Sequence, residues 1–269
     1  MKPGIHPNLP ETEYFASPAL SSTEARWLLD SPAKYKWMKD HREAPRDAFN
    51  FGSAVHSKVL GTGWGVEVLD FDSYRSKAAQ EARDDAYANA LVPILRAQAD
   101  EVDAVSESVL AHPTARALFE QEGQAEASVF ATDPVTGVET KARFDFLGGI
   151  AVDLKTTAGK ADQAGFAKSA ASYRYDVQQA HYLETLGNIR DDETAMVFVV
   201  VEKEPPYLVG VHQLSREFAE IGFEAAAEAR RIYAECVESG EWPGYPRDVQ
   251  LVQPPMWLIY QHQERFQRD

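Results

Sequence analysis

Residues 138–157 read VETKARFDFLGGIAVDLKTT, and this stretch decides the fold. Side chains alternate strictly through its first ten positions, as they do along a strand with one apolar face. One face carries Glu139, Lys141, Arg143 and Asp145, and the other carries Val138, Thr140, Ala142, Phe144 and Phe146. Two glycines then turn the chain into residues 150–156, where Asp153 and Lys155 share a face. The pattern predicts a β-hairpin that carries two carboxylates and a lysine.

The turn sets which residues face one another across this hairpin, because paired positions in an antiparallel ladder have a constant index sum. A regular two-residue turn at 148–149 would pair Asp145 with Val152, and the two acids would then point to opposite faces. A shared metal ion requires Asp145 to face Asp153. We therefore expect a three-residue connection, or a bulge with a glycine at positive φ.

These residue types suit metal-assisted phosphodiester hydrolysis. Two acids can hold a divalent cation, while a lysine orients or activates the attacking water and balances phosphate charge. Acid-x-lysine triplets also arise by chance, and the chain has two, at 139–141 and 153–155. The second is favoured because an acid-bearing strand precedes it and a predicted helix follows it directly. We therefore assign the candidate site to Asp153-Leu154-Lys155 together with Asp145.

Composition limits the remaining possibilities. The formal net charge of −15 argues against a surface that coats nucleic acid broadly, but it leaves room for one basic groove. Basic side chains gather at 34–46, where ordinary solvated charge is an equally good interpretation, and at 141–174. The single cysteine, Cys236, excludes a disulfide framework or an iron–sulfur cluster within one chain. With no apolar run of about 20 residues and no signal-peptide core, we expect a cytoplasmic protein.

The fold class predicted by the whole pattern is α/β, without a linker long enough to separate domains. Helices are expected from Ser21 or Ser22 with Glu24, and from Pro32. Further helices are expected at 51–60, 73–90, 94–111, 162–170, 172–186 and 215–239, and strands at 66–69, 127–131, 138–147, 150–156, 195–201 and 207–214. The chain then divides into an extended arm at 1–16, a mainly helical part at 17–121, a catalytic core at 122–246 and a tail at 247–269.

The order of these residues resembles the PD-(D/E)XK nuclease superfamily. The matching positions are His56, Glu126, Asp145, Asp153-x-Lys155 and Gln178-x-x-x-Tyr182. The RecE-like (exodeoxyribonuclease VIII) branch, related to lambda exonuclease and RecB nuclease domains, is the most similar. Local matches at Ser31-Pro32, Phe51-Gly52 and Trp242-Pro243-Gly244-Tyr245 extend the resemblance over about 17–246. Phe144 stands where the superfamily usually has a proline.

The resemblance implies a central mixed sheet flanked by helices, with an N-terminal helical extension, and a role for each matching residue. Asp145 and Asp153 would ligate Mg²⁺ or Mn²⁺ with help from the Leu154 carbonyl, and Lys155 would position the water. His56 would be a further ligand or part of the site wall, and Glu126 would orient a metal-bound water. The remaining residues would contact or steer DNA, or brace the site: Lys141, Arg143, Thr156, Thr157, Gln178 and Tyr182.

The function implied is a magnesium-dependent exonuclease of phage or prophage recombination. Such an enzyme would digest linear duplex DNA from 5′ to 3′ and leave 3′ overhangs for a single-strand annealing recombinase, and enzymes of this branch close into rings around DNA. Three alternatives remain open: a structure-specific or nicking endonuclease, an inactive DNA-binding scaffold on the same fold, and a docking or DNA-mimicking role for the acidic helices at 73–111.

Overall fold

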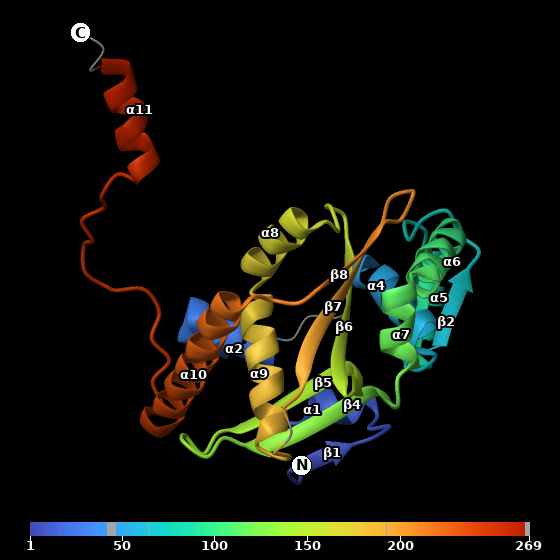
Figure 1. Cartoon of the computed structure of the whole chain (residues 1–269), viewed down its shortest axis with the longest axis horizontal. Coiled ribbons are helices and arrows are strands. Elements are labelled where there is room, and N and C mark those ends of the chain that lie inside the picture. The colour runs from blue at the N-terminus through green and yellow to red at the C-terminus, as the bar shows by residue number, and fades with distance from the viewer. Residues whose placement is uncertain (42–46, 64, 192, 267–269) are drawn as a thin grey trace.

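A six-stranded mixed sheet runs through the centre of the protein in the computed structural model, which describes residues 1–41, 47–63, 65–191 and 193–266 (Figure 1). The strand order is β1-β4-β5-β6-β7-β8. Only β6 and β7 run parallel, and the other neighbours are antiparallel. The strands are β1 (Gly4–His6), β4 (Gly123–Thr132), β5 (Glu139–Gly148), β6 (Ile150–Thr157), β7 (Ala195–Glu202) and β8 (Val209–His212). The predicted fold class, a mixed sheet flanked by helices, is confirmed.

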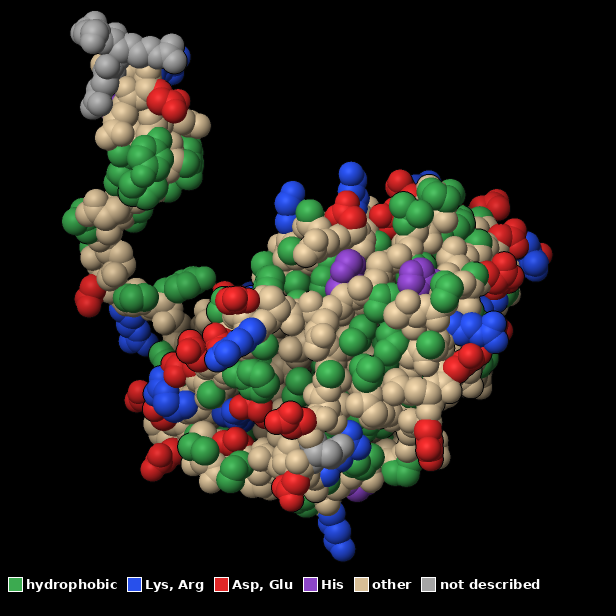
Figure 2. Space-filling view, in the orientation of Figure 1, with side chains coloured by type: hydrophobic (Ala, Val, Ile, Leu, Met, Phe, Trp, Pro, Cys, Tyr) green, Lys and Arg blue, Asp and Glu red, His purple; other side chains and the backbone are tan. Residues whose placement is uncertain are grey.

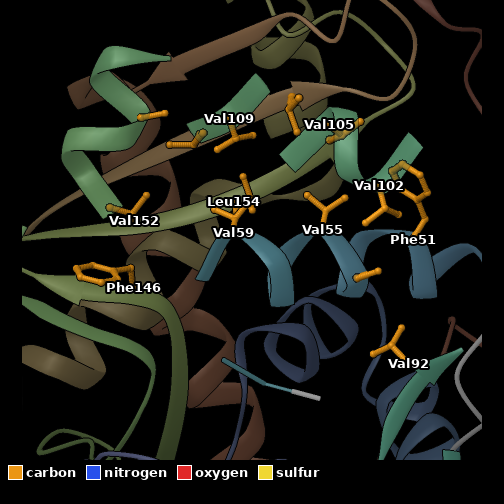
Figure 3. Close-up of a cluster of buried hydrophobic side chains, with 14 of the residues drawn as sticks. Phe51, Val55, Val59, Val92, Val102, Val105, Val109, Phe146, Val152 and Leu154 are labelled. Atoms are coloured by element: carbon orange, nitrogen blue, oxygen red, sulfur yellow. The ribbon is translucent and has the colours of Figure 1, made fainter. Parts of the chain in front are cut away.

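Helices cover both faces of the sheet and bury the two apolar faces of β6 and β7. On one face lie α4 (Asp47–Leu60), α6 (Arg96–Ala111) and α7 (Pro113–Glu120). Figure 3 shows this core, in which Val152 and Leu154 of β6 pack with Val55 of α4 and Val105 of α6. On the other face lie α8 (Gln163–Tyr173) and α9 (Tyr175–Gly187), with α10 (Arg216–Ser239) packed against α9. The β5–β6 hairpin is therefore held between two separate apolar cores.

The N-terminal residues are more structured than the extended arm expected at 1–16. They form β1, which adds to the sheet edge beside β4, and α1 (Glu11–Ala16). The cause is a contact from β5: the buried Lys141 ammonium donates to the carbonyls of Tyr14 and Ser17 and so ties the end of α1 to the sheet. α2 (Ser22–Asp30) begins after Ser21, one of the two serines expected to start it, which forms a capping box with Glu24, and α3 (Pro32–Asp40) begins with the predicted proline.

The segment at 65–95 contains a second, two-stranded parallel sheet. The strand expected at 66–69 is present as β2 (Gly65–Leu69), but its partner β3 (Leu91–Leu95) falls in a region expected to be helical or a break between helices. α5 (Lys77–Ala88) connects the two strands. Val92 and Ile94 of β3 are both buried in the core beneath α4 and α6, and Pro93 between them is buried as well. Burial of these β3 side chains therefore favours a strand at 91–95 over the expected helix or break.

The C-terminal tail ends in a helix that stands away from the rest of the molecule, α11 (Met256–Phe266) (Figure 1). Figure 2 shows apolar side chains gathered on this helix, and its exposed residues include Met256, Trp257, Leu258 and Tyr260. The preceding helix α10 begins at the predicted cap Ser215 and ends at Gly240 in the left-handed conformation. Across the described ranges, none of the helices combines the length and the apolar character that crossing a bilayer demands.

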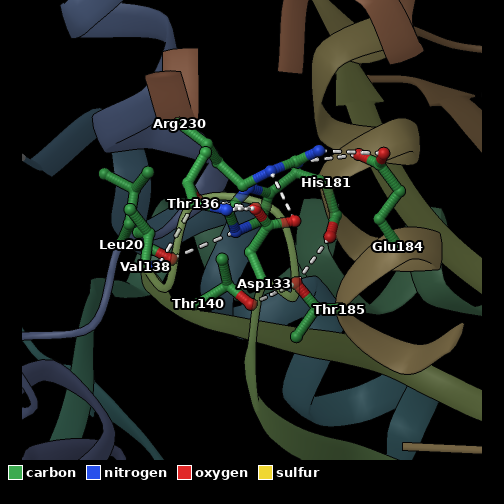
Figure 4. Close-up of polar contacts among 9 residues, drawn as sticks. All are labelled: Leu20, Asp133, Thr136, Val138, Thr140, His181, Glu184, Thr185 and Arg230. Atoms are coloured by element: carbon green, nitrogen blue, oxygen red, sulfur yellow. Dashed lines mark hydrogen bonds and ion pairs between the residues drawn. The ribbon is translucent and has the colours of Figure 1, made fainter. Parts of the chain in front are cut away.

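His181 of α9 makes the stability of this fold sensitive to acid. Its Nε2–H lies 3.1 Å from the Leu20 carbonyl and 3.2 Å from the Lys141 carbonyl, and burial lowers the pKa of the ring to about 4 (Figure 4). The unfolded chain takes up a proton near pH 6.5, whereas the folded one resists until about pH 4. The contribution of neutral His181 to the free energy of unfolding is therefore fully present above pH 6.5, and it is lost as the pH falls from 6.5 towards 4.

We expect urea unfolding to show this loss directly. Between pH 7.5 and pH 5, the wild type should lose about 2 kcal/mol more unfolding free energy than His181→Gln, which has no imidazole to protonate. His262→Gln, at an exposed position of α11, should follow the wild type at both pH values. Equal losses in the wild type and His181→Gln would contradict the prediction.

Candidate active site

The predicted register of the β5–β6 hairpin is confirmed. Phe146 pairs with Val152 and Leu147 with Ala151, which sets Asp145 across from Asp153. The connection is the expected three residues, 148–150. Neither glycine in it has positive φ. Gly148 is instead required by close approach, because a Cβ there would lie 2.7 Å from the Gln121 side chain.

Beyond these two pairs, β5 and β6 separate and open a slot in the sheet. Leu20 takes the vacated edge of β5, since its N–H donates to the Glu139 carbonyl and its carbonyl accepts from the Lys141 N–H, both at 2.8 Å. On the β6 side, the Leu154 N–H donates to Asp145 Oδ2 at 2.7 Å. The N–H and C=O of one strand residue point to the same edge, so the Leu154 carbonyl also faces the slot.

The expected alternation of side chains between the two faces of β5 was predicted to continue through Phe146, and this prediction is wrong at Asp145. Phe144 packs on the α9 side, with its ring 5.0 Å from that of Tyr182, whereas Phe146 belongs to the core under α4. Opposite Asp145 on β4, Glu126 has a φ of 54°, a left-handed conformation that is uncommon for a glutamate. Local strain of this kind concentrates at functional sites. Here it accompanies a change of side in both strands and turns Glu126 and Asp145 towards α4.

These two acids meet His56 of α4. One ligand atom from each of His56, Glu126 and Asp145 lies within 4.8 Å of the others, and His56 Nδ1 is 3.5 Å from Asp145 Oδ2. Burial raises the pKa of Asp145 to about 6; His56 opposes this shift and the Asp153 carboxylate adds to it. Two carboxylates and an imidazole could hold a divalent cation, whose charge would offset the crowding of these acids.

Asp153 lies in the slot but is engaged by its own neighbours. Its Oδ2 is 2.5 Å from the Lys155 ammonium, and its Oδ1 accepts from the Gln178 amide of α9, also at 2.5 Å. Burial alone would lower the pKa of Lys155, but Asp153 and Asp145 together raise it above its ordinary value. Lys155 is therefore a fixed positive charge at neutral pH. Gln178 braces the site, one of the two roles expected for it.

Tyr182 also lies beside the acids. Burial, with the Asp153 charge, raises the pKa of its hydroxyl to about 12, so it stays protonated. Thr156, on the opposite face of β6, lies beside Gly52 of α4, whose added Cβ would be 3.5 Å from the Thr156 hydroxyl. The Thr157 hydroxyl accepts from the Gly159 N–H in the loop that follows β6. Thr156 and Thr157 thus lie at the end of β6, and their role in contacting DNA stays a prediction.

Two basic residues expected to steer phosphate are placed elsewhere. Lys141 is only 1% exposed and holds the end of α1, as described above. Arg143 donates to Glu126 at 2.5 Å, to the Leu9 carbonyl and to Ser128. Both expectations are corrected: the N-terminal segment covers this face of β5, and Arg143 positions Glu126.

Two further residues lie beside the Asp153–Lys155 pair and were not predicted from the sequence, Arg26 of α2 and Tyr175 of α9. Arg26 donates to the Tyr173 carbonyl at 2.6 Å, and its charge acts on Asp153, Tyr175 and Tyr182. The Lys155 ammonium lies 4.8 Å from the centre of the Tyr175 ring. Tyr175 precedes the Gln178-x-x-x-Tyr182 motif by one helical turn, a spacing that could have indicated it. The sequence around Arg26 gives no such signal.

Acids and a lysine at diverging strands of a mixed sheet define the PDDEXK-like nuclease fold. Residues 21–254 match the family described as "PDDEXK-like domain of unknown function (DUF3799)", and the chain belongs to this family. Comparison with curated proteins gives no match.

Solved structures that match this chain include two whose names describe exonucleases. A "Putative exonuclease" from Eubacterium rectale has a TM-score of 0.61 at 14% identity, over 95% of this chain and 98% of its own. The fold is therefore shared with that protein. A phage related exonuclease from Haemophilus somnus 129PT gives a TM-score of 0.35 at 9% identity, over 86% of this chain and 100% of its own, which is too low to support an inference.

Proposed function

We propose that this protein is a metal-dependent deoxyribonuclease that removes nucleotides from the ends of linear duplex DNA. The observation that carries the proposal is the slot between β5 and β6. It brings a metal-binding group, His56, Glu126 and Asp145, next to the Asp153–Lys155 pair. Crowding these partly buried charges around the buried Asp153 is costly and has no use in a scaffold, which disfavours the alternative of an inactive DNA-binding protein.

His56, Glu126, Asp145 and the Leu154 carbonyl would hold the cation, with Asp153 completing the set when its carboxylate turns from Gln178. The cation would supply a Lewis acid for the scissile phosphate and lower the pKa of the attacking water. Lys155, fixed as an ammonium by Asp153, orients that water and offsets the charge that develops on the phosphate. Arg143 holds Glu126 in place, where its carboxylate would help to orient a water bound to the cation. The protonated Tyr182 hydroxyl is available to donate to a phosphate oxygen.

Exonuclease action is preferred over endonuclease action because it matches the sequence resemblance, although both share the same chemistry. The test is to incubate linear and covalently closed duplex with Mg²⁺ and follow the loss of each. Loss of the linear form alone supports the proposal, whereas nicking of the closed circle supports the endonuclease. End-labelled strands then report the polarity, which we propose to be 5′ to 3′. We also propose that the protein forms a ring-shaped homo-oligomer, which light scattering tests. An annealing recombinase is its proposed partner, which co-purification tests.

Hydrolysis should depend on the metal and not on the thiol. We expect Mg²⁺ or Mn²⁺ to support activity and Ca²⁺ to inhibit it, because the looser coordination of Ca²⁺ binds substrate without aligning the attack. Alkylating reagents should have no effect, since Cys236 is buried on α10 and burial raises the pKa of its thiol. Rates measured after chelation and after each metal is added back test the first part. Inactivation by alkylation of Cys236, or by removal of iron, would contradict the second.

A further inference from the structure

A ladder of aromatic rings leads from the active slot to the surface, through the connection between α8 and α9. Its inner rungs are the buried Phe198 of β7 and Phe166 of α8. Tyr175 stacks on both, with centroids 5.9 Å and 6.2 Å away and interplanar angles of 19° and 25°. Tyr173 stacks in turn on Tyr175 at 5.8 Å and 24°. The Tyr173 and Tyr175 rings are close to parallel, so the outermost ring of the ladder is the flat face of Tyr173.

The outer rung is open to solvent. Tyr173 is 61% exposed although its ring stacks on Tyr175. Its backbone is nevertheless fixed, because Arg26 of α2 donates to the Tyr173 carbonyl and Arg174 makes the turn between α8 and α9 in the left-handed conformation. An exposed ring on a rigid support is suited to binding a second flat group.

The middle ring of the ladder, Tyr175, contacts Lys155 of the proposed site. The Lys155 ammonium lies over the Tyr175 ring, 4.8 Å from its centre, while it pairs with Asp153. Arg26 adds a second positive charge between the ladder and α2. A strand whose phosphate lies at Lys155 therefore passes the stacked tyrosines, with positive charge beside its backbone. Nucleobases stack on aromatic side chains without regard to sequence, since every base has a π-face.

We propose that Tyr173 and Tyr175 form a stacking platform for an unpaired nucleobase of the strand being cleaved. This inference rests on the proposed function, because it takes the scissile phosphate to lie at Lys155. The platform holds a base that has left the duplex near the reacting end, and thereby favours frayed or single-stranded ends. No base-specific donor or acceptor is needed, so the preference is for an unpaired base of any identity.

The test uses duplexes with a three-nucleotide unpaired end, bound to the full chain in Ca²⁺ so that they are held without cleavage. The fluorescent base 2-aminopurine is placed in turn at each of the three unpaired positions. Stacking on Tyr173 should quench it at one of them, and Tyr173→Ala should abolish that quenching and weaken binding about tenfold. Tyr173→Trp should restore both. Tyr245→Ala, at an even more exposed tyrosine in the segment after α10, should behave as the wild type.

A second measurement separates stacking from a general loss of structure. An abasic residue at the quenched position should weaken binding to the wild type about tenfold and leave binding to Tyr173→Ala unchanged. An equal loss in both proteins, or wild-type quenching and affinity in Tyr173→Ala, would overturn the platform while leaving the nuclease proposal intact. Failure of the wild type itself to bind or cleave any DNA end would instead overturn the proposed function, and the platform with it.

Discussion

Asp153→Asn is expected to reduce DNA hydrolysis by about three orders of magnitude without unfolding the protein. The substitution removes the negative charge that pairs with Lys155 at 2.5 Å and that would complete the cation site, but it keeps an oxygen for the Gln178 amide. Loss of one such preorganised group costs about 4 kcal/mol of transition-state stabilisation, and each ~1.4 kcal/mol is tenfold in rate. Lys155→Met should be similarly slow. Single-turnover rates on a linear duplex in Mg²⁺ measure both.

Glu139→Gln is the matched control, because Glu139 is the acid of the other acid-x-lysine triplet and lies exposed on β5. We expect this variant to cleave at the wild-type rate, and all three variants to keep the wild-type circular dichroism spectrum. Retention of more than about a tenth of the rate by Asp153→Asn would contradict the site assignment, since that corresponds to a loss of only ~1.4 kcal/mol.

The hairpin register could be predicted because chemistry and geometry constrain it together. Only an even index sum lets Asp145 face Asp153, and the glycines at 148–149 give the chain room for a three-residue connection. The change of side at Asp145 could not be predicted. It accompanies a left-handed Glu126 on the neighbouring strand, and a glutamate carries no sequence signal for that conformation.

The contacts of Lys141 and Arg143 could not be predicted, for another reason. A period-two pattern tells which side chains share a face, but not which distant segment covers that face. Residues 9–17, more than a hundred positions away, supply the carbonyls that both side chains bind. The same long-range pairing explains why β1 was missed, since three residues form a strand only where β4 offers an open edge. Sequence pattern is local, and these contacts are not.

Arg230→Met is expected to destabilise the fold by about 3–5 kcal/mol, the usual cost of removing one partner from a buried ion pair. Arg230 of α10 is only 5% exposed. It donates to both oxygens of Glu184 on α9, at 2.8 Å and 2.9 Å, and lies 3.2 Å from Asp133 in the β4–β5 turn (Figure 4). Without Arg230, the buried Asp133 carboxylate loses its positive partner and, among the described residues, keeps the hydrogen bonds from Thr136. Urea unfolding at pH 7.5 measures the loss.

The neighbouring arginine provides the control for this prediction. Arg231 also contacts two acids, Glu228 and Glu235, but these pairs lie on the solvent-exposed surface of α10, so Arg231→Met should change the free energy of unfolding far less than Arg230→Met. Arg230→Lys should fall between the two, because one ammonium cannot span two carboxylates as a guanidinium does. Adding Asp133→Asn to Arg230→Met should recover part of the loss, since it removes the unpaired charge. If Arg230→Met and Arg231→Met cost the same, the buried cluster does not join α9, α10 and the β4–β5 turn in the way its geometry indicates.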